Sequence, residues 1–149
     1  MNFFGVHDPY TAWALLTFLA LPPLLLVFYV ALRLIARRNE NARWEDARRE
    51  LEDGDPDGPS STQALGVARG LVPSGPGHEV RWVAGRFKGV PVALIRSRLR
   101  LTGDGVARIV ALPPGHVPVV ERANAHDFPP RDLARRLDRL IAQAPERRS

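Results

Sequence analysis

The chain of 149 residues contains no cysteine, which excludes disulfides, thiol catalysis and metal sites built from thiolates. Lysine is almost absent as well, because a single Lys88 stands against 20 arginines. A GC-rich genome explains this bias more simply than selection for bidentate anion binding. Charge is missing altogether between Ala12 and Leu32, where 12 of the 21 residues are Leu, Val or Phe.

Motifs of known catalytic chemistry are also lacking. The chain has no GxSxG, no Walker loop and no GxGxxG sequence. Its histidines are scattered and show no metal-ligand spacing with another His, Asp or Glu; they are His7, His78, His116 and His126. We therefore expect a protein that is not an enzyme, with no catalytic residues, no cofactor and no bound metal.

The uncharged stretch predicts a transmembrane helix over residues 10–36. At 1.5 Å per residue, a helix of this length crosses the roughly 30 Å hydrocarbon layer of a bilayer. Asp8 and Pro9 suit the N-cap and the first helical position, which leaves residues 1–9 as a short segment outside the membrane. A cleavable signal peptide is disfavoured, because the apolar run is too long and no basic residue precedes it.

The distribution of basic residues predicts the orientation of this helix. Arg33, Arg37 and Arg38 follow the apolar run, whereas the first ten residues contain no Lys or Arg. By the positive-inside rule, the N-terminus lies outside and residues 39–149 lie in the cytoplasm. We therefore expect a single-pass protein of a bacterial inner membrane.

Two adjacent prolines, Pro22 and Pro23, stand at the centre of the predicted span. Each removes a backbone donor, so the carbonyls of Phe18 and Leu19 lose their usual partners. A kinked spanning helix that packs against a neighbouring helix is favoured. The alternative is a re-entrant hairpin that turns at the prolines and keeps both ends on one side.

An acidic segment follows the span. Residues 39–58 carry eight acids against three arginines, whereas residues 59–149 have a net charge of +8. Residues 37–52 contain no Gly or Pro and predict a charged helical stalk, and residues 53–60 predict a flexible linker. Trp44, Ala47 and Leu51 form a thin apolar edge at helical spacing. We expect a solvated stalk; the alternative is that this edge packs on the following domain or on another subunit.

Residues 61–149 predict a basic cytoplasmic domain with an antiparallel sheet. Two alternating segments flank Lys88-Gly89, which is typical of a two-residue hairpin loop. The expected pairs are Trp82 with Ile95, Ala84 with Ala93, and Glu79 with Arg98. A second, three-residue turn at 103–105 would place Leu101 opposite Ala107 and Leu99 opposite Ile109. A fourth short strand is expected at 117–121, and a short helix with Leu65, Ala68 and Leu71 precedes the sheet.

A helix over residues 130–144 completes the domain. Its apolar stripe has helical spacing and consists of Leu133, Leu137, Leu140 and Ile141. We expect it to pack on the sheet face formed by Trp82, Ile95, Leu99 and Ile109. The predicted fold class is α+β, with one N-terminal transmembrane helix, a helical stalk and a small antiparallel β-meander packed by a C-terminal amphipathic helix.

The opposite sheet face collects arginines that only Glu79 relieves; they are Arg81, Arg96, Arg98, Arg100 and Arg108. Like charges across strands are destabilising, so this face favours an acidic partner. It is a solvated face, a surface for anionic lipid headgroups, or a surface for an acidic protein or the chain's own stalk. Nucleic acid is disfavoured, because the face lacks interleaved aromatic residues.

The order of one N-out helix and a small β-rich cytoplasmic domain resembles the H subunit of bacterial photosynthetic reaction centres. This similarity concerns architecture alone and carries over no residue. We expect a non-catalytic accessory subunit that packs laterally in a larger membrane complex through Pro22 and Pro23, and that covers an acidic cytoplasmic surface. The alternative is a free-standing anchored module that binds anionic lipid or an acidic ligand through the basic face.

Overall fold

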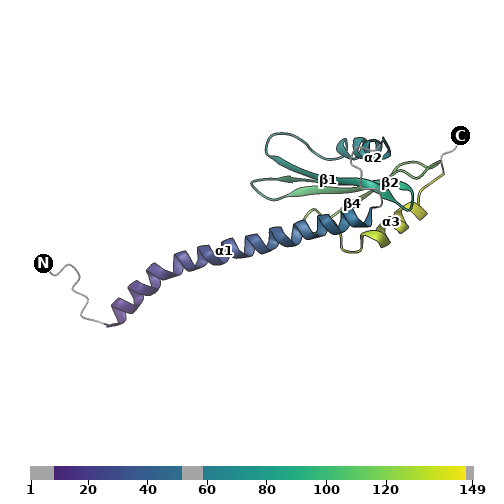
Figure 1. Ribbon diagram of the computed structural model, residues 1–149. Helices are drawn as coiled ribbons and strands as arrows, with labels where there is room; N and C mark the ends of the chain where they lie inside the picture. Colours follow the sequence, from purple (N-terminus) through teal and green to yellow (C-terminus); the bar gives the residue numbers. More distant parts are fainter. Residues whose placement is uncertain (1–8, 52–58, 147–149) are drawn as a thin grey trace. The chain divides into compact units, whose positions relative to one another are not determined.

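The computed structural model describes residues 9–51 and 59–146, which form three helices and a four-stranded sheet (Figure 1). In chain order these are α1 (Pro9–Glu50), α2 (Pro59–Arg69), β1 (His78–Phe87), β2 (Val90–Leu99), β3 (Gly105–Ala111), β4 (Val119–Ala123) and α3 (Leu133–Ala142). The expected α+β class is confirmed. The chain divides into two compact units, the second of which begins at Glu40. The second unit therefore contains the last three turns of α1, the sheet and the two shorter helices.

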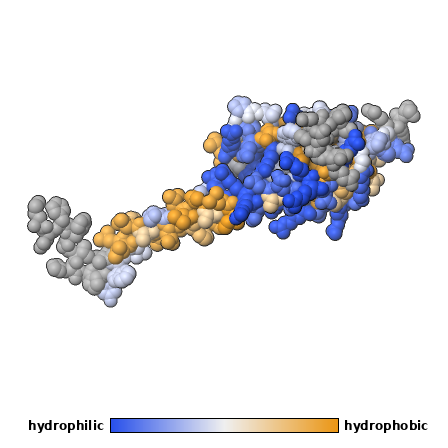
Figure 2. Space-filling model, viewed as in Figure 1, coloured by the Kyte–Doolittle hydropathy of each residue, from blue (hydrophilic) through white to orange (hydrophobic). Residues whose placement is uncertain are grey.

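In the first unit, α1 continues through Pro22 and Pro23 without interruption. The re-entrant alternative is therefore wrong, and the two prolines lie within one continuous helix. The large apolar side chains between Trp13 and Ile35 are exposed and form a continuous hydrophobic surface (Figure 2). Of the helices in the described part of the chain, α1 alone is long and apolar enough to cross a bilayer.

The sheet is an antiparallel meander with strand order β1-β2-β3-β4. Lys88 and Gly89 both have positive φ, of 50° and 79°, as a two-residue type I′ hairpin requires. The register of this hairpin is confirmed at all three expected pairs: Trp82 with Ile95, Ala84 with Ala93, and Glu79 with Arg98.

The expected register between β2 and β3 is wrong. Ile109 pairs with Leu94 rather than with Leu99, and Arg98 pairs with Gly105. Residues 100–104 therefore form the turn, here called the β2–β3 turn. Gly105 begins β3 and pairs with Arg98, and a Cβ there would lie 2.5 Å from the Ser97 carbonyl oxygen, so only glycine fits this strand position. The register differs by an odd number of residues, which moves Ile109 to the other sheet face.

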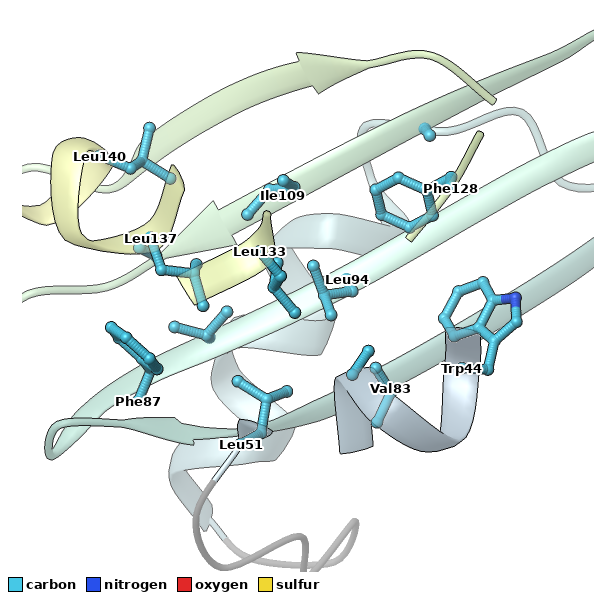
Figure 3. Packing of buried hydrophobic residues seen from close by; sticks show 14 of the residues in the cluster. Trp44, Leu51, Val83, Phe87, Leu94, Ile109, Phe128, Leu133, Leu137 and Leu140 are labelled. Atoms are coloured by element: carbon cyan, nitrogen blue, oxygen red, sulfur yellow. The ribbon is translucent and has the colours of Figure 1, made fainter. Parts of the chain in front are cut away.

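Both faces of the sheet consequently carry apolar core residues. The first face carries Val83, Leu94 and Ile109, which cluster with leucines of α3 and with Trp44 and Leu51 (Figure 3). The second face packs against α2, and its cluster comprises Ala64, Leu65, Ala68, Val72, Ala84, Ala93, Ile95 and Val110. The expectation that the C-terminal helix packs on the Trp82 and Ile95 face is therefore wrong, because α3 lies on the first face.

The apolar edge after the membrane span is also buried. Trp44, Ala47 and Leu51 retain only 2–5% of their surface and belong to the core cluster of the first face. The expected solvated stalk is therefore wrong, and the alternative in which the edge packs on the following domain is correct. Of the predicted linker, residues 53–58 lie outside the described part, and Pro59 and Ser60 begin α2.

The other predicted elements differ mainly at their ends. Helix α3 begins three residues later than expected and buries Leu133, Leu137 and Leu140. In the segment after α2, Val72 is buried while Leu71 stays partly exposed, contrary to the expected helix face. Strand β4 begins two residues later than predicted.

The core role of α3 predicts the effect of truncating Leu137, which is fully buried. Leu137→Ala should lower the free energy of unfolding by about 2–5 kcal/mol, because it removes buried methyl groups and leaves a cavity. Urea denaturation of the full chain in detergent, followed by tryptophan fluorescence, measures this change. Val117→Ala is the matched exposed control and should stay within about 0.5 kcal/mol. Equal losses in the two variants would contradict the packing of α3.

Candidate functional site

The β2–β3 register decides where the five predicted arginines lie. Arg81 pairs with Arg96, and Arg98 follows on the same sheet face, so these three are brought together. Arg108 pairs with Ile95 and therefore lies on the second face. Arg100 lies beyond the end of β2, in the β2–β3 turn. The five do not form one surface.

A single carboxylate from α1 lies among the three grouped arginines. Glu40 Oε1 accepts a short hydrogen bond from Arg96 Nη2, and Arg81 Nη1 lies 3.4 Å from the same oxygen. Its other oxygen, Oε2, lies 3.4 Å from Arg98 Nη1. Arg81 Nη1 also donates to Asn41 Oδ1 at 2.8 Å. We call Glu40, Arg81, Arg96 and Arg98 the Glu40 cluster.

Arg96 is the buried member of this cluster, with 1% of its side chain exposed. The Trp44 ring lies beside two of the guanidinium groups, at 5.8 Å from that of Arg96 and 5.3 Å from that of Arg81. The same ring makes an edge contact with Phe128 at 5.6 Å. Arg96 Nε and Nη1 and Trp44 Nε1 have no hydrogen-bond partner among the described residues. Glu40 and the indole face are thus the groups that compensate the buried charge.

The surrounding charges alter the acidity of Glu40. Burial alone would raise its pKa, but the hydrogen bond and charge of Arg96, with the charges of Arg98 and Arg81, outweigh burial and lower the pKa below 4.5. A carboxyl whose pKa is lower in the folded state stabilises that state when ionised. This stabilisation is complete above the ordinary pKa and is lost as the pH falls through the folded-state pKa.

A second group of charges lies around an open depression of about 430 Å³ between the end of β4 and the start of α3. Three arginines and two aspartates line it, and most of them are paired: Arg43 binds Asp127 at 3.2 Å, and Arg136 binds Asp132 and the neighbouring Glu121 at 3.0 Å. The bond from Arg136 lowers the pKa of Asp132. The third arginine, Arg131, is exposed, so the depression offers a ligand at most one cation outside these pairs.

Metal-ligating groups do not gather in the described part of the chain. In residues 9–51 and 59–146, no group of three or more His, Asp or Glu side chains has the proximity to hold a metal ion. His116 Nδ1 lies 2.9 Å from the Pro114 carbonyl oxygen, as a turn contact. Ser97 Oγ donates to the Pro73 carbonyl, which fits a packed hydroxyl.

Sequence reasoning missed Glu40, one of eight acids between residues 39 and 58. The available signal was its spacing, because Glu40 precedes Trp44 by four residues and so shares its helix face. The stalk is one of the partners that the sequence allows for the arginines, but the apolar edge and the basic face are separate patterns, and neither alone selects one acid. Together they identify which acid is involved.

No protein-family model matches this chain, and no curated protein or solved structure matches it either. The architectural resemblance to a reaction-centre subunit is therefore not accompanied by a match in sequence or fold. What the site can do follows from its residues alone. Within the second unit, the Glu40 cluster joins the last turns of α1 to the sheet.

Neutralising Glu40 should destabilise the second unit. Glu40→Gln leaves the Arg96 charge buried without a carboxylate, and the free energy of unfolding should fall by about 3 kcal/mol at pH 7. The difference from the parent chain should shrink as the pH falls below 4.5 and through the lower folded-state pKa of Glu40, because below that pKa Glu40 is protonated in both states. Thermal denaturation from pH 7 to pH 3 measures this. Glu45→Gln, an exposed change on the same helix, should have little effect at any pH.

Removing Arg96 should be milder than removing Glu40. In Arg96→Met, Glu40 keeps Arg81 and Arg98 within 3.4 Å, and the buried position receives an apolar side chain of similar length. An unpaired buried charge is more costly than an apolar replacement. Denaturation of the two variants side by side should give the larger loss for Glu40→Gln. The opposite order would show that Arg96 does not depend on Glu40.

Proposed function

We propose that the protein is a non-catalytic, single-pass accessory subunit of a larger assembly in a bacterial inner membrane. The observation that carries this proposal is the dual role of α1. Its apolar stretch belongs to the first unit, and its last turns supply Glu40, Trp44 and Leu51 to the core of the second. An ordinary tether would not need a buried cluster at its end. The arrangement suits a subunit whose domain is kept close to a membrane partner by the covalent chain.

Lateral contacts in the bilayer would come from the exposed apolar side chains of α1. Pro22 and Pro23 cannot donate backbone hydrogen bonds, so the carbonyls of Phe18 and Leu19 are left for another partner. In hydrocarbon, a neighbouring helix or a water molecule must supply it. The partner we propose is another membrane-protein subunit that packs at this level of the helix.

The proposed orientation rests on the arginines after the span. By the positive-inside rule, Arg33, Arg37 and Arg38 favour a cytoplasmic location for that end. The Arg33 guanidinium lies 6.0 Å from the Tyr29 ring centroid, which suits a side chain extending toward an interface. Residues 39–149 would then be cytoplasmic, where their basic part, residues 59–149, covers an acidic surface of the assembly.

A second candidate function is a free-standing module that binds anionic lipid or an acidic ligand. The grouped arginines favour it less than the sequence suggested, because Arg81, Arg96 and Arg98 already share Glu40. The exposed β2–β3 turn favours it, since Arg100 lies there beside Leu101. The two candidates differ in whether a protein partner of fixed stoichiometry exists.

Purification from native membranes in mild detergent tests the accessory-subunit proposal. We expect co-migration with partners at fixed stoichiometry, and loss of those partners when residues 10–36 are replaced by an unrelated spanning helix. A replacement of surface charge, Glu45→Gln, is the matched control and should retain them. A lone monomer from native membranes would reject the proposal and favour the lipid module.

Topology is tested with single cysteines, which the cysteine-free chain allows without background labelling. A membrane-impermeant maleimide should label Asn2→Cys in spheroplasts, because the N-terminus is proposed to lie outside. It should label the exposed Val117→Cys only after lysis. The reverse pattern would overturn the orientation, and labelling of both before lysis would exclude a sealed span.

A further inference from the structure

The β2–β3 turn presents the most exposed apolar side chain of the second unit. Leu101 is 100% exposed, and Leu99 at the end of β2 is partly exposed. Arg100 between them is exposed and forms no ion pair with a described residue. A fully exposed leucine in a turn contributes nothing to the core. Its apolar surface is therefore available for contact with something outside the second unit.

The β2–β3 turn lies close to Glu40, the residue at which the chain enters the second unit. Arg98 connects the two places, because its Nε donates to the Gly103 carbonyl at 3.2 Å and its Nη1 lies 3.4 Å from Glu40 Oε2. Glu40 is the first residue of the second unit. The turn is therefore separated from that first residue by one arginine side chain.

Another exposed apolar side chain is located at the same end of the sheet. Arg100 N donates to the Gly77 carbonyl, so the end of the segment between α2 and β1 lies beside the β2–β3 turn (Figure 1). Val80, near the start of β1, is partly exposed there. Besides Glu40, the acids of this end are Glu79 and Asp104, of which Asp104 lies at the base of the turn.

The covalent chain limits how far this end can be from a bilayer. Glu40 follows the predicted span, residues 10–36, by four residues. Even fully extended, four residues cover at most about 14 Å. This limit holds for any orientation of the second unit. The headgroup layer is therefore within reach of the end that bears Leu101.

We propose that the β2–β3 turn is a membrane-contacting tip. Leu101 inserts at the boundary between headgroups and acyl chains of the bilayer that α1 spans, and Arg100 binds the anionic headgroups. The partner is an anionic leaflet, because the tip combines an apolar side chain with an adjacent cation. This inference rests on the membrane anchoring of the proposed function but requires no protein partner.

Fluorescence of a single labelled cysteine tests the tip. The full chain with Leu101→Cys carries an environment-sensitive dye and is reconstituted, at a high lipid-to-protein ratio, in vesicles of phosphatidylcholine and phosphatidylglycerol. We expect a blue shift of the dye emission and its loss when spin-labelled lipids are included. The control is Val117→Cys, in the loop between β3 and β4 at the opposite end of the sheet. Its emission should stay that of dye in water.

Three outcomes would overturn the tip. Emission from position 101 that matches position 117, in protein that co-floats with the vesicles, rejects the tip and leaves the anchor intact. A blue shift that spin-labelled lipids do not quench, or that vanishes when vesicle lipid is increased, indicates contact with protein. Protein that fails to co-float, or is washed from vesicles by carbonate, rejects the anchor itself, so the two failures are distinguishable.

Arg100→Gln in the Leu101→Cys chain tests the role of charge. In vesicles with phosphatidylglycerol, quenching should fall to the level seen in phosphatidylcholine alone. The matched control is Arg86→Gln, which also removes one positive charge. Arg86 is exposed at the other end of β1, beside the β1–β2 hairpin, so this variant should leave quenching unchanged. Equal quenching in the Arg100→Gln and parent chains would overturn the binding of anionic headgroups.

Discussion

The burial of one positive charge is the constraint on which the second unit depends. Arg96 lies in the middle strand region of a sheet that is covered on both faces, and a guanidinium cannot release its proton at any physiological pH. A buried charge of this kind needs a carboxylate close by, and Glu40 of α1 supplies it. Because Glu40 is one turn from Trp44, the ion pair also sets which face of α1 packs on Val83 and Phe128.

Local patterns predicted much of this fold. The β1–β2 register followed from Lys88-Gly89 and from alternation, and the leucine stripe of α3 followed from helical spacing. The predicted β2–β3 register was wrong because Gly105 is typical of a turn in sequence. In the structure it belongs to β3, where glycine is needed because the Ser97 carbonyl oxygen approaches closely. That error assigned Ile109 and Arg108 to the wrong sheet faces. It also suggested that one face is charged and solvent-exposed, although helices pack on both faces.

The sequence predicted that arginines would gather at the candidate site, but it did not predict that Glu40 would pair with them. Grouping arginines from paired strands correctly brought Arg81, Arg96 and Arg98 together. A charged sheet face suggests an external acidic partner, because the alternation of residues in a strand does not indicate which distant segment covers that face. In the stalk, an acid and a tryptophan one helical turn apart were the pattern that identifies the covering segment. Local sequence cannot predict that these two segments are in contact, because the contact depends on the tertiary fold.

The pairing of Glu40 with three arginines has a mechanical meaning. Successive residues of a helix are about 100° apart around its axis, so a turn of α1 by one residue removes the carboxylate from the guanidinium groups. The same rotation breaks the edge contact between the Trp44 ring and Phe128. Within the second unit, rotation of the last turns of α1 about their axis is therefore opposed by charge and by packing at once. These turns accordingly have one preferred rotational setting against the sheet.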